Sequence, residues 1–274
     1  MKQVRKGIRR VLAACVAVGM ALTGCVNQAE PGEELGSFLA ETVVYTGEAH
    51  EGTGIYYRGT GEDPFVVVLD AGHQGKGNGE QEPVGPDAAD TKDKVTTGAT
   101  GAFSGVPESE LNLAVALALR DELIRRGYSV VMVRETQDVD ISNRERALMA
   151  NEYEADAYVR IHANAHSARS ARGALTMCQS ENNPYPACAA AYADSLALSE
   201  AVLDAFCEAT DMPKRSIIET DSMTGLNWSE VPSTIIEMGF LSNQTDDLLM
   251  NTPAFHTSAA IGIANGLDAF LRKE

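Results

Sequence analysis

The sequence predicts an α/β fold: a single domain with a mostly parallel central sheet flanked by helices. Apolar runs of strand length alternate along the chain with stretches of helical periodicity, which is the order expected of βαβ units. Several of these runs are continuous rather than alternating, as in strands that are covered on both faces. Residues 64–274 are long enough for one such domain, and no internal repeat is visible.

The strands are predicted from their apolar and β-branched residues. The first runs without interruption from Phe65 to Leu69 and ends at Asp70. Further strands are expected at 129–134, 156–161, 173–178, 217–219 and 233–238.

Helices are expected between these strands. Over 108–126, apolar residues recur at helical spacing from Leu111 to Leu123, and Gly127 supplies a C-terminal stop. A helix over 142–154 begins at Ser142, and Glu145 three residues later completes a capping box. An alanine-rich helix is expected over 187–210 and a closing helix over 253–272.

Residues 1–24 are predicted to be a lipoprotein signal peptide. Five basic residues precede an apolar stretch over 11–22, which is too short to span a bilayer because a helix needs about 20 residues. The stretch ends in Leu22-Thr23-Gly24-Cys25, which resembles a bacterial lipobox. This resemblance implies an extracytoplasmic protein anchored to the membrane by a lipidated Cys25. The alternative is an ordinary secretory signal in which Cys25 falls near the cleavage site.

The formal net charge is −17 at pH 7, and removal of residues 1–24 would take it to −22. A chain this acidic argues against nucleic acid as a partner, because neutralising phosphates requires Lys and Arg. It also argues against electrostatic attraction to anionic lipid, so membrane association would depend on the acyl anchor.

The cysteines of the domain lie in a compartment where thiols can oxidise. Cys178 and Cys188 flank a turn-rich segment that could bring them together, so a disulfide is one expectation and two free thiols is the other. Cys207 is expected to be a small buried hydrophobic residue.

Four separated polar residues each follow a predicted strand or begin a predicted helix: His73, Glu108, His162 and Glu237. The carboxyl ends of parallel strands line one edge of a sheet, where ligands bind. Two imidazoles and one carboxylate converging there would form a zinc site with an open fourth position, and the second carboxylate would act as a base. Asp70 is expected to support His73 through a hydrogen bond. The pattern predicts a zinc hydrolase.

Considered singly, these residues leave alternatives open. Acidic residues are common at helix starts, and Glu110 competes with Glu108 for the same role. His166 follows His162 by four residues, so a helical pair could bind zinc instead. Glu237 follows two isoleucines on an expected core strand, where an unpaired carboxylate is costly unless it meets an ion-pair partner or a polar site.

Two polar stretches lie outside the predicted elements. Residues 25–63 are predicted to be a flexible tether, because their composition buries too little apolar surface to offset the entropy of ordering. A short hairpin within 42–57 is also considered. Residues 74–107 are long for a structureless loop and lie between His73 and Glu108, so we expect them to form a rim over the site.

Four ordered blocks of the sequence resemble the zinc-dependent N-acetylmuramoyl-L-alanine amidases of the Amidase_3 type. The blocks are Asp70-Ala71-Gly72-His73, Glu108-Ser109-Glu110-Leu111-Asn112-Leu113, Ile161-His162-Ala163-Asn164 and Ile236-Glu237-Met238-Gly239-Phe240-Leu241-Ser242-Asn243. The resemblance covers the chain from Phe65 to the C-terminus, so the catalytic domain is placed at 64–274. It implies that His73, Glu108 and His162 hold one Zn²⁺ per chain and that Glu237 is the catalytic glutamate.

The same resemblance implies hydrolysis of the amide bond between N-acetylmuramic acid and L-alanine, with peptidoglycan as the partner. Asn164, Arg160 and Trp228 are expected to line the substrate groove, with 74–107 and 221–228 as its walls. Arg160 stands where relatives often have serine. The alternatives are a catalytically inactive wall-binding lipoprotein and a zinc peptidase acting on another bond of the wall peptide. The sequence identifies no protein activator.

Overall fold

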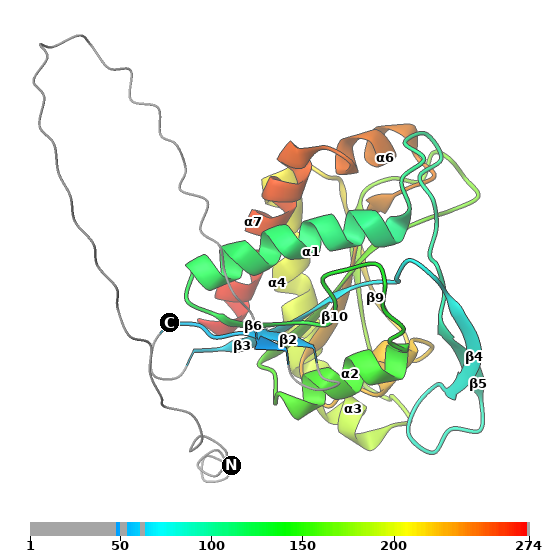
Figure 1. The fold of residues 1–274 in the computed structure, drawn as a ribbon, viewed down its shortest axis with the longest axis vertical. Coiled ribbons are helices and arrows are strands. Elements are labelled where there is room, and N and C mark those ends of the chain that lie inside the picture. Colours follow the sequence, from blue (N-terminus) through cyan, green and yellow to red (C-terminus); the bar gives the residue numbers. More distant parts are fainter. Residues whose placement is uncertain (1–47, 50–53, 61–63, 273–274) are drawn as a thin grey trace, which may run out of the picture. The chain divides into compact units, whose positions relative to one another are not determined.

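The computed structural model describes residues 48–49, 54–60 and 64–272 (Figure 1). The predicted signal peptide, Cys25 and most of the predicted tether lie outside this part of the chain. Within it, no helix combines the length and the apolar character needed to cross a membrane.

The centre of the domain is an eight-stranded sheet with the order β1-β2-β6-β3-β7-β10-β8-β9. Neighbouring strands run parallel in the pairs β3–β6, β3–β7, β7–β10 and β8–β9, which confirms the expected mostly parallel sheet. The pairs β1–β2, β2–β6 and β8–β10 are antiparallel. The strand bounds are β1 Glu48–Ala49, β2 Ile55–Tyr57, β3 Val66–Ala71, β6 Ser129–Met132, β7 Ala157–Asn164, β8 Ala174–Cys178, β9 Lys214–Glu219 and β10 Ser233–Phe240.

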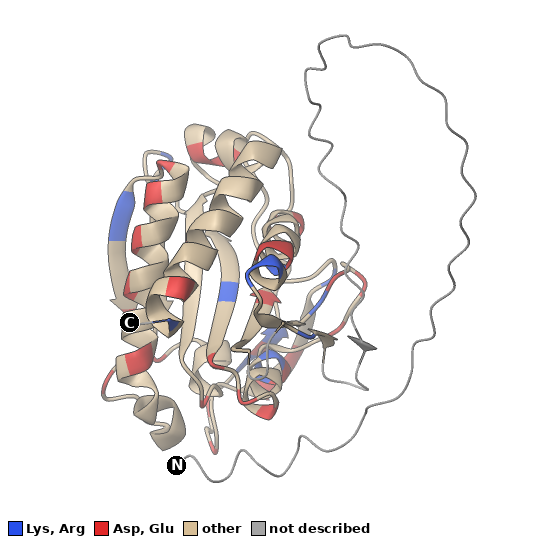
Figure 2. Cartoon of the chain, turned by 90° about the vertical axis from the view of Figure 1, so that its left-hand side faces the viewer, with Lys and Arg blue, Asp and Glu red and all other residues tan. Residues whose placement is uncertain are grey.

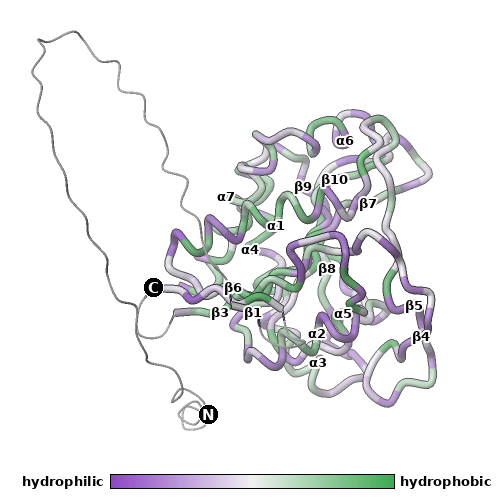
Figure 3. Tube along the Cα trace, in the orientation of Figure 1, coloured by the Kyte–Doolittle hydropathy of each residue, from purple (hydrophilic) through white to green (hydrophobic). Residues whose placement is uncertain are grey.

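Helices cover both faces of the sheet (Figure 1). α1 (Glu108–Arg125), α4 (Tyr192–Thr210) and α7 (Pro253–Leu271) lie on one face, and α2 (Asn143–Glu152) with α5 (Thr224–Asn227) lies on the other. The short helices α3 (Pro186–Ala190) and α6 (Gln244–Met250) complete the set. Figure 3 shows the central strands as hydrophobic, as expected of a sheet buried on both faces.

The two faces of β7 differ, because successive side chains of a strand point to opposite sides. Ala157, Val159 and Ile161 belong to the larger apolar core with α1, α4 and α7. Tyr158 packs in the smaller core with α2, so Arg160 and His162 project from that same side. The side of the sheet that carries α2 therefore also carries the polar residues.

The predicted loop 74–107 is not structureless. It contains a separate two-stranded sheet, β4 (Asn78–Pro83) and β5 (Thr91–Val95), which appears in Figure 3 as a largely hydrophilic segment. Polar contacts link the two strands: Gln81 Nε2 donates to Asp93 Oδ1 (2.5 Å), and Lys94 pairs with Glu80 (2.7 Å). The hairpin has little apolar alternation, so its sequence carries no strand signal.

Three other expectations are corrected. β2 lies within the predicted tether but pairs with β6 of the central sheet, so this part of 25–63 is ordered, and the antiparallel pair β1–β2 falls within the hairpin considered over 42–57. The helix expected over 187–210 is divided into α3 and α4, with Ala191 as the capping residue between them. The disulfide is absent: Cys178 and Cys188 are buried free thiols, and Cys188 Sγ donates to Leu226 O (3.2 Å).

Acidic positions are spread along the helices, as Figure 2 shows, in agreement with a solvated acidic surface. A few charged residues are instead buried in the interior: Asp70, Arg134, Arg146 and Arg160 are at most 3% exposed. All four lie close to the turn that follows β3.

Candidate active site and metal centre

The carboxyl ends of β3 and β7 and the first turn of α1 bring the three predicted ligands together. Glu108 Oε1 lies 3.1 Å from His73 Nε2 and 3.2 Å from His162 Nδ1. One ligand atom from each residue lies within 4.8 Å of the other two. Two imidazole nitrogens and one carboxylate oxygen form a donor set used by catalytic zinc sites, which leave a fourth position open. The residues fit a zinc ion.

The competing ligands lie outside this cluster. Glu108 is 4% exposed and begins α1, whereas Glu110 is exposed. His166 is also exposed, and its Nδ1 accepts a hydrogen bond from Ala168 N (3.0 Å). His162 belongs to a strand rather than a helix, so it cannot form a helical pair with His166.

The loop between β5 and α1 supports two of the ligands through its backbone. His73 Nδ1 lies 2.9 Å from Thr96 O, and a proton on Nδ1 donated to that carbonyl directs Nε2 toward the cluster. Ala99 N donates to Glu108 Oε2 (2.9 Å). Gly98 has φ +78°, and a Cβ there would lie 2.7 Å from Glu108 Oε2 and 2.8 Å from His73 Cδ2. Hydrogen bonds from backbone atoms give no signal in the sequence. Gly98 is the sequence feature that reflects the close approach of this loop to His73 and Glu108.

A buried ion cluster lies beneath the ligands. Asp70 Oδ1 accepts from Arg146 Nη1 (2.6 Å), and Asp70 Oδ2 accepts from Arg160 Nε (2.8 Å) and Tyr158 OH (3.1 Å). Burial alone would raise the pKa of Asp70, but the two guanidinium groups hold it well below its usual range. The expected support of His73 by Asp70 is wrong, because the ring nitrogen Nδ1 of His73 contacts the loop before α1 instead.

Two arginines hold the turn that carries His73. Arg134 Nε donates to Ala71 O (2.8 Å), Arg134 Nη2 donates to Gly72 O (3.1 Å), and Arg146 Nη2 donates to His73 O (3.1 Å). His73 has φ 61°, a left-handed conformation that costs a residue with a Cβ about 1–3 kcal/mol. The arginine hydrogen bonds offset this cost and fix the backbone of the ligand.

Two of the candidate ligands, His162 and Glu108, have the protonation states that metal binding requires. Burial lowers the pKa of His162 to about 4, so its imidazole is neutral at pH 7. Burial would raise the pKa of Glu108, but hydrogen bonds with His162 and His73 hold it well below its usual range. A neutral imidazole and an ionised carboxylate therefore face one another.

Glu237 lies on β10 directly beside His162 on β7, in register. Burial and the negative charge of Glu108 raise the pKa of Glu237 to about 8, while Arg160 opposes the shift. Among the described residues, no group forms a hydrogen bond with its buried Oε2. A cation at the cluster would lower this pKa and keep the carboxylate able to accept a proton. The register between β10 and β7 shifts between Glu237 and Phe240, so regular pairing ends just after the glutamate.

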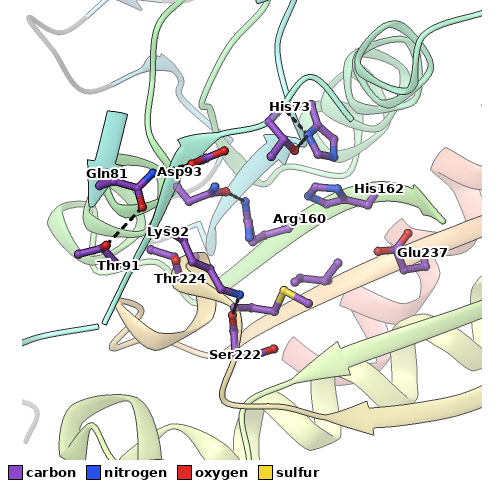
Figure 4. A pocket seen from close by; sticks show the side chains of 15 residues that line it. His73, Gln81, Thr91, Lys92, Asp93, Arg160, His162, Ser222, Thr224 and Glu237 are labelled. Atoms are coloured by element: carbon purple, nitrogen blue, oxygen red, sulfur yellow. Dashed lines mark hydrogen bonds between the residues drawn. The ribbon is translucent and has the colours of Figure 1, made fainter. Parts of the chain in front are cut away.

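A pocket of about 580 Å³ opens beside this cluster (Figure 4). The hairpin β4–β5 and the segment before α5 line it, so the expected rim and wall are observed. Lys92 Nζ on the hairpin donates to Ser222 O (2.5 Å) and links these two walls. The lining residues include His73, Gln81, Thr91, Lys92, Asp93, Thr96, Asn143, Arg160, His162, Ser222, Met223, Thr224, Gly225, Ile235 and Glu237.

Of the three residues expected in the groove, only Arg160 lines this pocket. Trp228 instead supports the hairpin from outside the pocket: its Nε1 donates to Pro83 O (2.9 Å), and the guanidinium of Arg144 lies 4.3 Å from its ring centroid. Asn164 is used locally, since its Oδ1 accepts from Ala165 N (2.7 Å). Sequence reasoning gave Asn143 no role in the pocket. It is the first residue of α2, and its Oδ1 accepts a hydrogen bond from Arg160 Nη2 (2.7 Å).

Comparison with known proteins agrees with this geometry. The family model for N-acetylmuramoyl-L-alanine amidase matches residues 67–269. The chain is 29% identical over 221 residues to the N-acetylmuramoyl-L-alanine amidase Rv3717 of Mycobacterium tuberculosis, covering 76% of this chain and 86% of that protein. It is 28% identical over 205 residues to the uncharacterised Bacillus subtilis protein YqiI, covering 75% and 84% respectively.

A solved structure shares the fold. The amidase Ami1 of Mycobacterium smegmatis superposes with a TM-score of 0.69 at 26% identity, covering 77% of this chain and 98% of that one. The family model spans six of the eight strands of the sheet, from β3 to β10 in the chain, both flanking helical layers and the cluster of His73, Glu108, His162 and Glu237. On this evidence the chain is an enzyme of the N-acetylmuramoyl-L-alanine amidase family.

Proposed function

We propose that this protein hydrolyses the amide bond between N-acetylmuramic acid and L-alanine of the peptidoglycan stem peptide in a zinc-dependent reaction. The observation that carries the proposal is the convergence of His73, Glu108 and His162 beside Glu237 at one edge of the sheet. Amides are poor electrophiles, so the site must activate both water and the carbonyl group. A bound zinc ion supplies Lewis-acid chemistry for both purposes.

The protein's own residues supply proton transfer. Glu237 accepts a proton from the attacking water as the water oxygen bonds to the lactyl carbonyl carbon. Glu237 then returns that proton to the L-alanine nitrogen as the carbon–nitrogen bond breaks. The second water proton leaves the new carboxylic acid and is taken up by the amine, so the products are a carboxylate and a protonated amine. His162 is a neutral imidazole, and the ionised Glu108 would balance part of the charge of a bound cation.

The test is mass spectrometry of peptidoglycan digested with the purified protein. The expected products are stem peptides with free L-alanine amino termini and glycan strands without peptides. A chelator should abolish the digestion and added Zn²⁺ should restore it. New amino termini inside the stem peptide would indicate a peptidase instead, and digestion unaffected by chelation would exclude the metal mechanism.

We further propose that the protein acts outside the cytoplasm on a lipid anchor at Cys25. The support is the order of the N-terminal segment: a basic start, an apolar stretch and Leu22-Thr23-Gly24-Cys25. Labelling cells with a palmitate analogue should mark the wild-type protein and leave Cys25→Ser unlabelled. Equal labelling of both proteins would overturn the anchor.

A further inference from the structure

Arg160 lies next to the metal centre on the floor of the pocket. It precedes His162 by two residues on β7, so both side chains project from the same side of the sheet. Residues two positions apart on a strand are separated by about 6.5 Å, so the backbones of His162 and Arg160 lie about that far apart along β7. Figure 4 shows Arg160 between His162 and the hairpin residues Lys92, Gln81 and Thr91.

The guanidinium of Arg160 is held in one orientation. Its Nε donates to Asp70 Oδ2 (2.8 Å), and its Nη2 donates to Asn143 Oδ1 (2.7 Å). Its Nη1 lies against Gly225, where a Cβ would collide with it. Gly225 itself lines the pocket. Because the side chain is already ordered, a ligand that meets it loses little further conformational entropy.

Among the described residues, Arg160 has one ion-pair partner, and it shares that partner with another arginine. Asp70 is shared between Arg160 and the buried Arg146, so one carboxylate faces two guanidinium groups. Arg146 has no exposed surface, whereas Arg160, although only 3% exposed, lines the pocket together with Glu237. On the opposite wall, Asp93 accepts from Gln81 and Lys92 donates to Ser222 O.

We infer that Arg160 binds a carboxylate of the stem peptide, two residues beyond the bond that is cut. This inference rests on the proposed function. Two extended peptide residues span about 7 Å, which matches the distance along β7 from His162 to Arg160. The group at that position is the α-carboxylate of the second stem residue, a γ-linked D-glutamate. A guanidinium is a donor only, so it distinguishes this carboxylate from the carboxamide found when the residue is amidated.

The experiment compares two synthetic muramoyl tripeptides that differ only in whether the α-carboxyl of the second residue is free or amidated. The zinc-loaded wild-type protein should cleave the free form with a kcat/KM about tenfold higher or more, as expected for a charge-assisted hydrogen bond. In Arg160→Gln the ratio of kcat/KM for the free substrate to kcat/KM for the amidated substrate should fall to about one. Arg160→Lys should retain part of the preference for the free form. Lys92→Gln is the matched control, because it removes the other cation of the pocket and should keep the preference.

The outcomes separate this inference from the proposed function. Equal cleavage of both substrates by the wild-type protein overturns the role of Arg160 and leaves the amidase activity standing. A preference that survives in Arg160→Gln, or is lost only in Lys92→Gln, also overturns it. Failure to cleave either substrate counts against the amidase activity and therefore against both. The wild-type comparison requires no variant, so it holds even if Arg160→Gln does not fold.

Discussion

Asp70 and Arg146 form an ion pair with no exposed surface, with Oδ1 2.6 Å from Nη1. Removing two charges from water costs desolvation free energy, and here each partner offsets part of that cost by forming further hydrogen bonds within the same cluster. Arg146 also donates to the carbonyl of His73, and Asp70 also holds Arg160. The pair therefore connects the strained turn that carries His73 with the lining of the pocket.

Asp70→Asn should destabilise the fold by about 3–5 kcal/mol, because it leaves two buried guanidinium groups without a counter-charge. The difference in unfolding free energy between the wild type and Asp70→Asn should depend on pH. The folded-state pKa of Asp70 is far below its unfolded value, so its contribution is complete above that unfolded value of about 4 and shrinks as the pH falls below it.

Chemical denaturation of the wild type and Asp70→Asn between pH 3 and 7 measures this difference. The gap in unfolding free energy should be constant above about pH 5 and should narrow toward pH 3. Asp87→Asn is a control, since Asp87 is exposed on the hairpin turn. A gap that is small at pH 7, or that widens in acid, would contradict the assigned role of the pair.

Glu237→Gln should lower the rate of amide hydrolysis by about 10²–10⁴-fold, the usual contribution of a general acid–base group. Zinc content should stay at one ion per chain, because the substitution leaves all three ligands in place. The melting temperature should be equal or higher, since a neutral amide replaces a carboxylate whose buried Oε2 has no hydrogen-bond partner among the described residues. A variant that hydrolyses the substrate at the wild-type rate would exclude Glu237 as the base.

His162→Ala should lose zinc, whereas His166→Ala should keep it. His162 belongs to the three-residue cluster, while His166 is exposed and contacts its own loop. Removal of a ligand should weaken the zinc affinity by more than the 10–100-fold typical of outer-shell changes. Metal content after dialysis against a competing chelator distinguishes the two variants. Stoichiometric zinc in His162→Ala would require a different ligand set.

The positions of the candidate ligands could be predicted because each lies at the beginning or end of a regular element, whereas the choice of Glu108 over Glu110 and of His162 over His166 depended on the family resemblance. His73 follows a continuous apolar run, and His162 lies near the end of another. Ser142 and Glu145 form both hydrogen bonds of the predicted capping box. These signals are local in sequence, so they can be recognised without knowledge of the tertiary structure.

The support around the ligands could not be predicted for the opposite reason. Arg146 comes from α2 and lies 73 residues from the His73 carbonyl that it binds. Ala99 acts through its backbone N–H, and Thr96 contacts His73 through its backbone carbonyl as well as its hydroxyl. Backbone groups are common to all residues, so they give no signal in the sequence. The hairpin β4–β5 depends on polar contacts between its own strands and with Asn143, which donates to Lys94 O. Such partners are fixed only when the whole chain has folded.

Gly72→Ala should weaken zinc binding although Gly72 is not a ligand. A Cβ at this position would collide with Cε1 and Nε2 of the His162 ring, so the imidazole would have to move away from Glu108. The expected loss of zinc affinity is about 10–100-fold, as for other changes that misplace a ligand. Hydrolysis should fall with it and recover in part at high zinc concentration. Gly79→Ala is the matched control, because a Cβ there meets no atom within 4 Å and should change stability by no more than about 0.5 kcal/mol. If both variants bind zinc as tightly as the wild type, the contact between Gly72 and His162 does not set the ligand geometry.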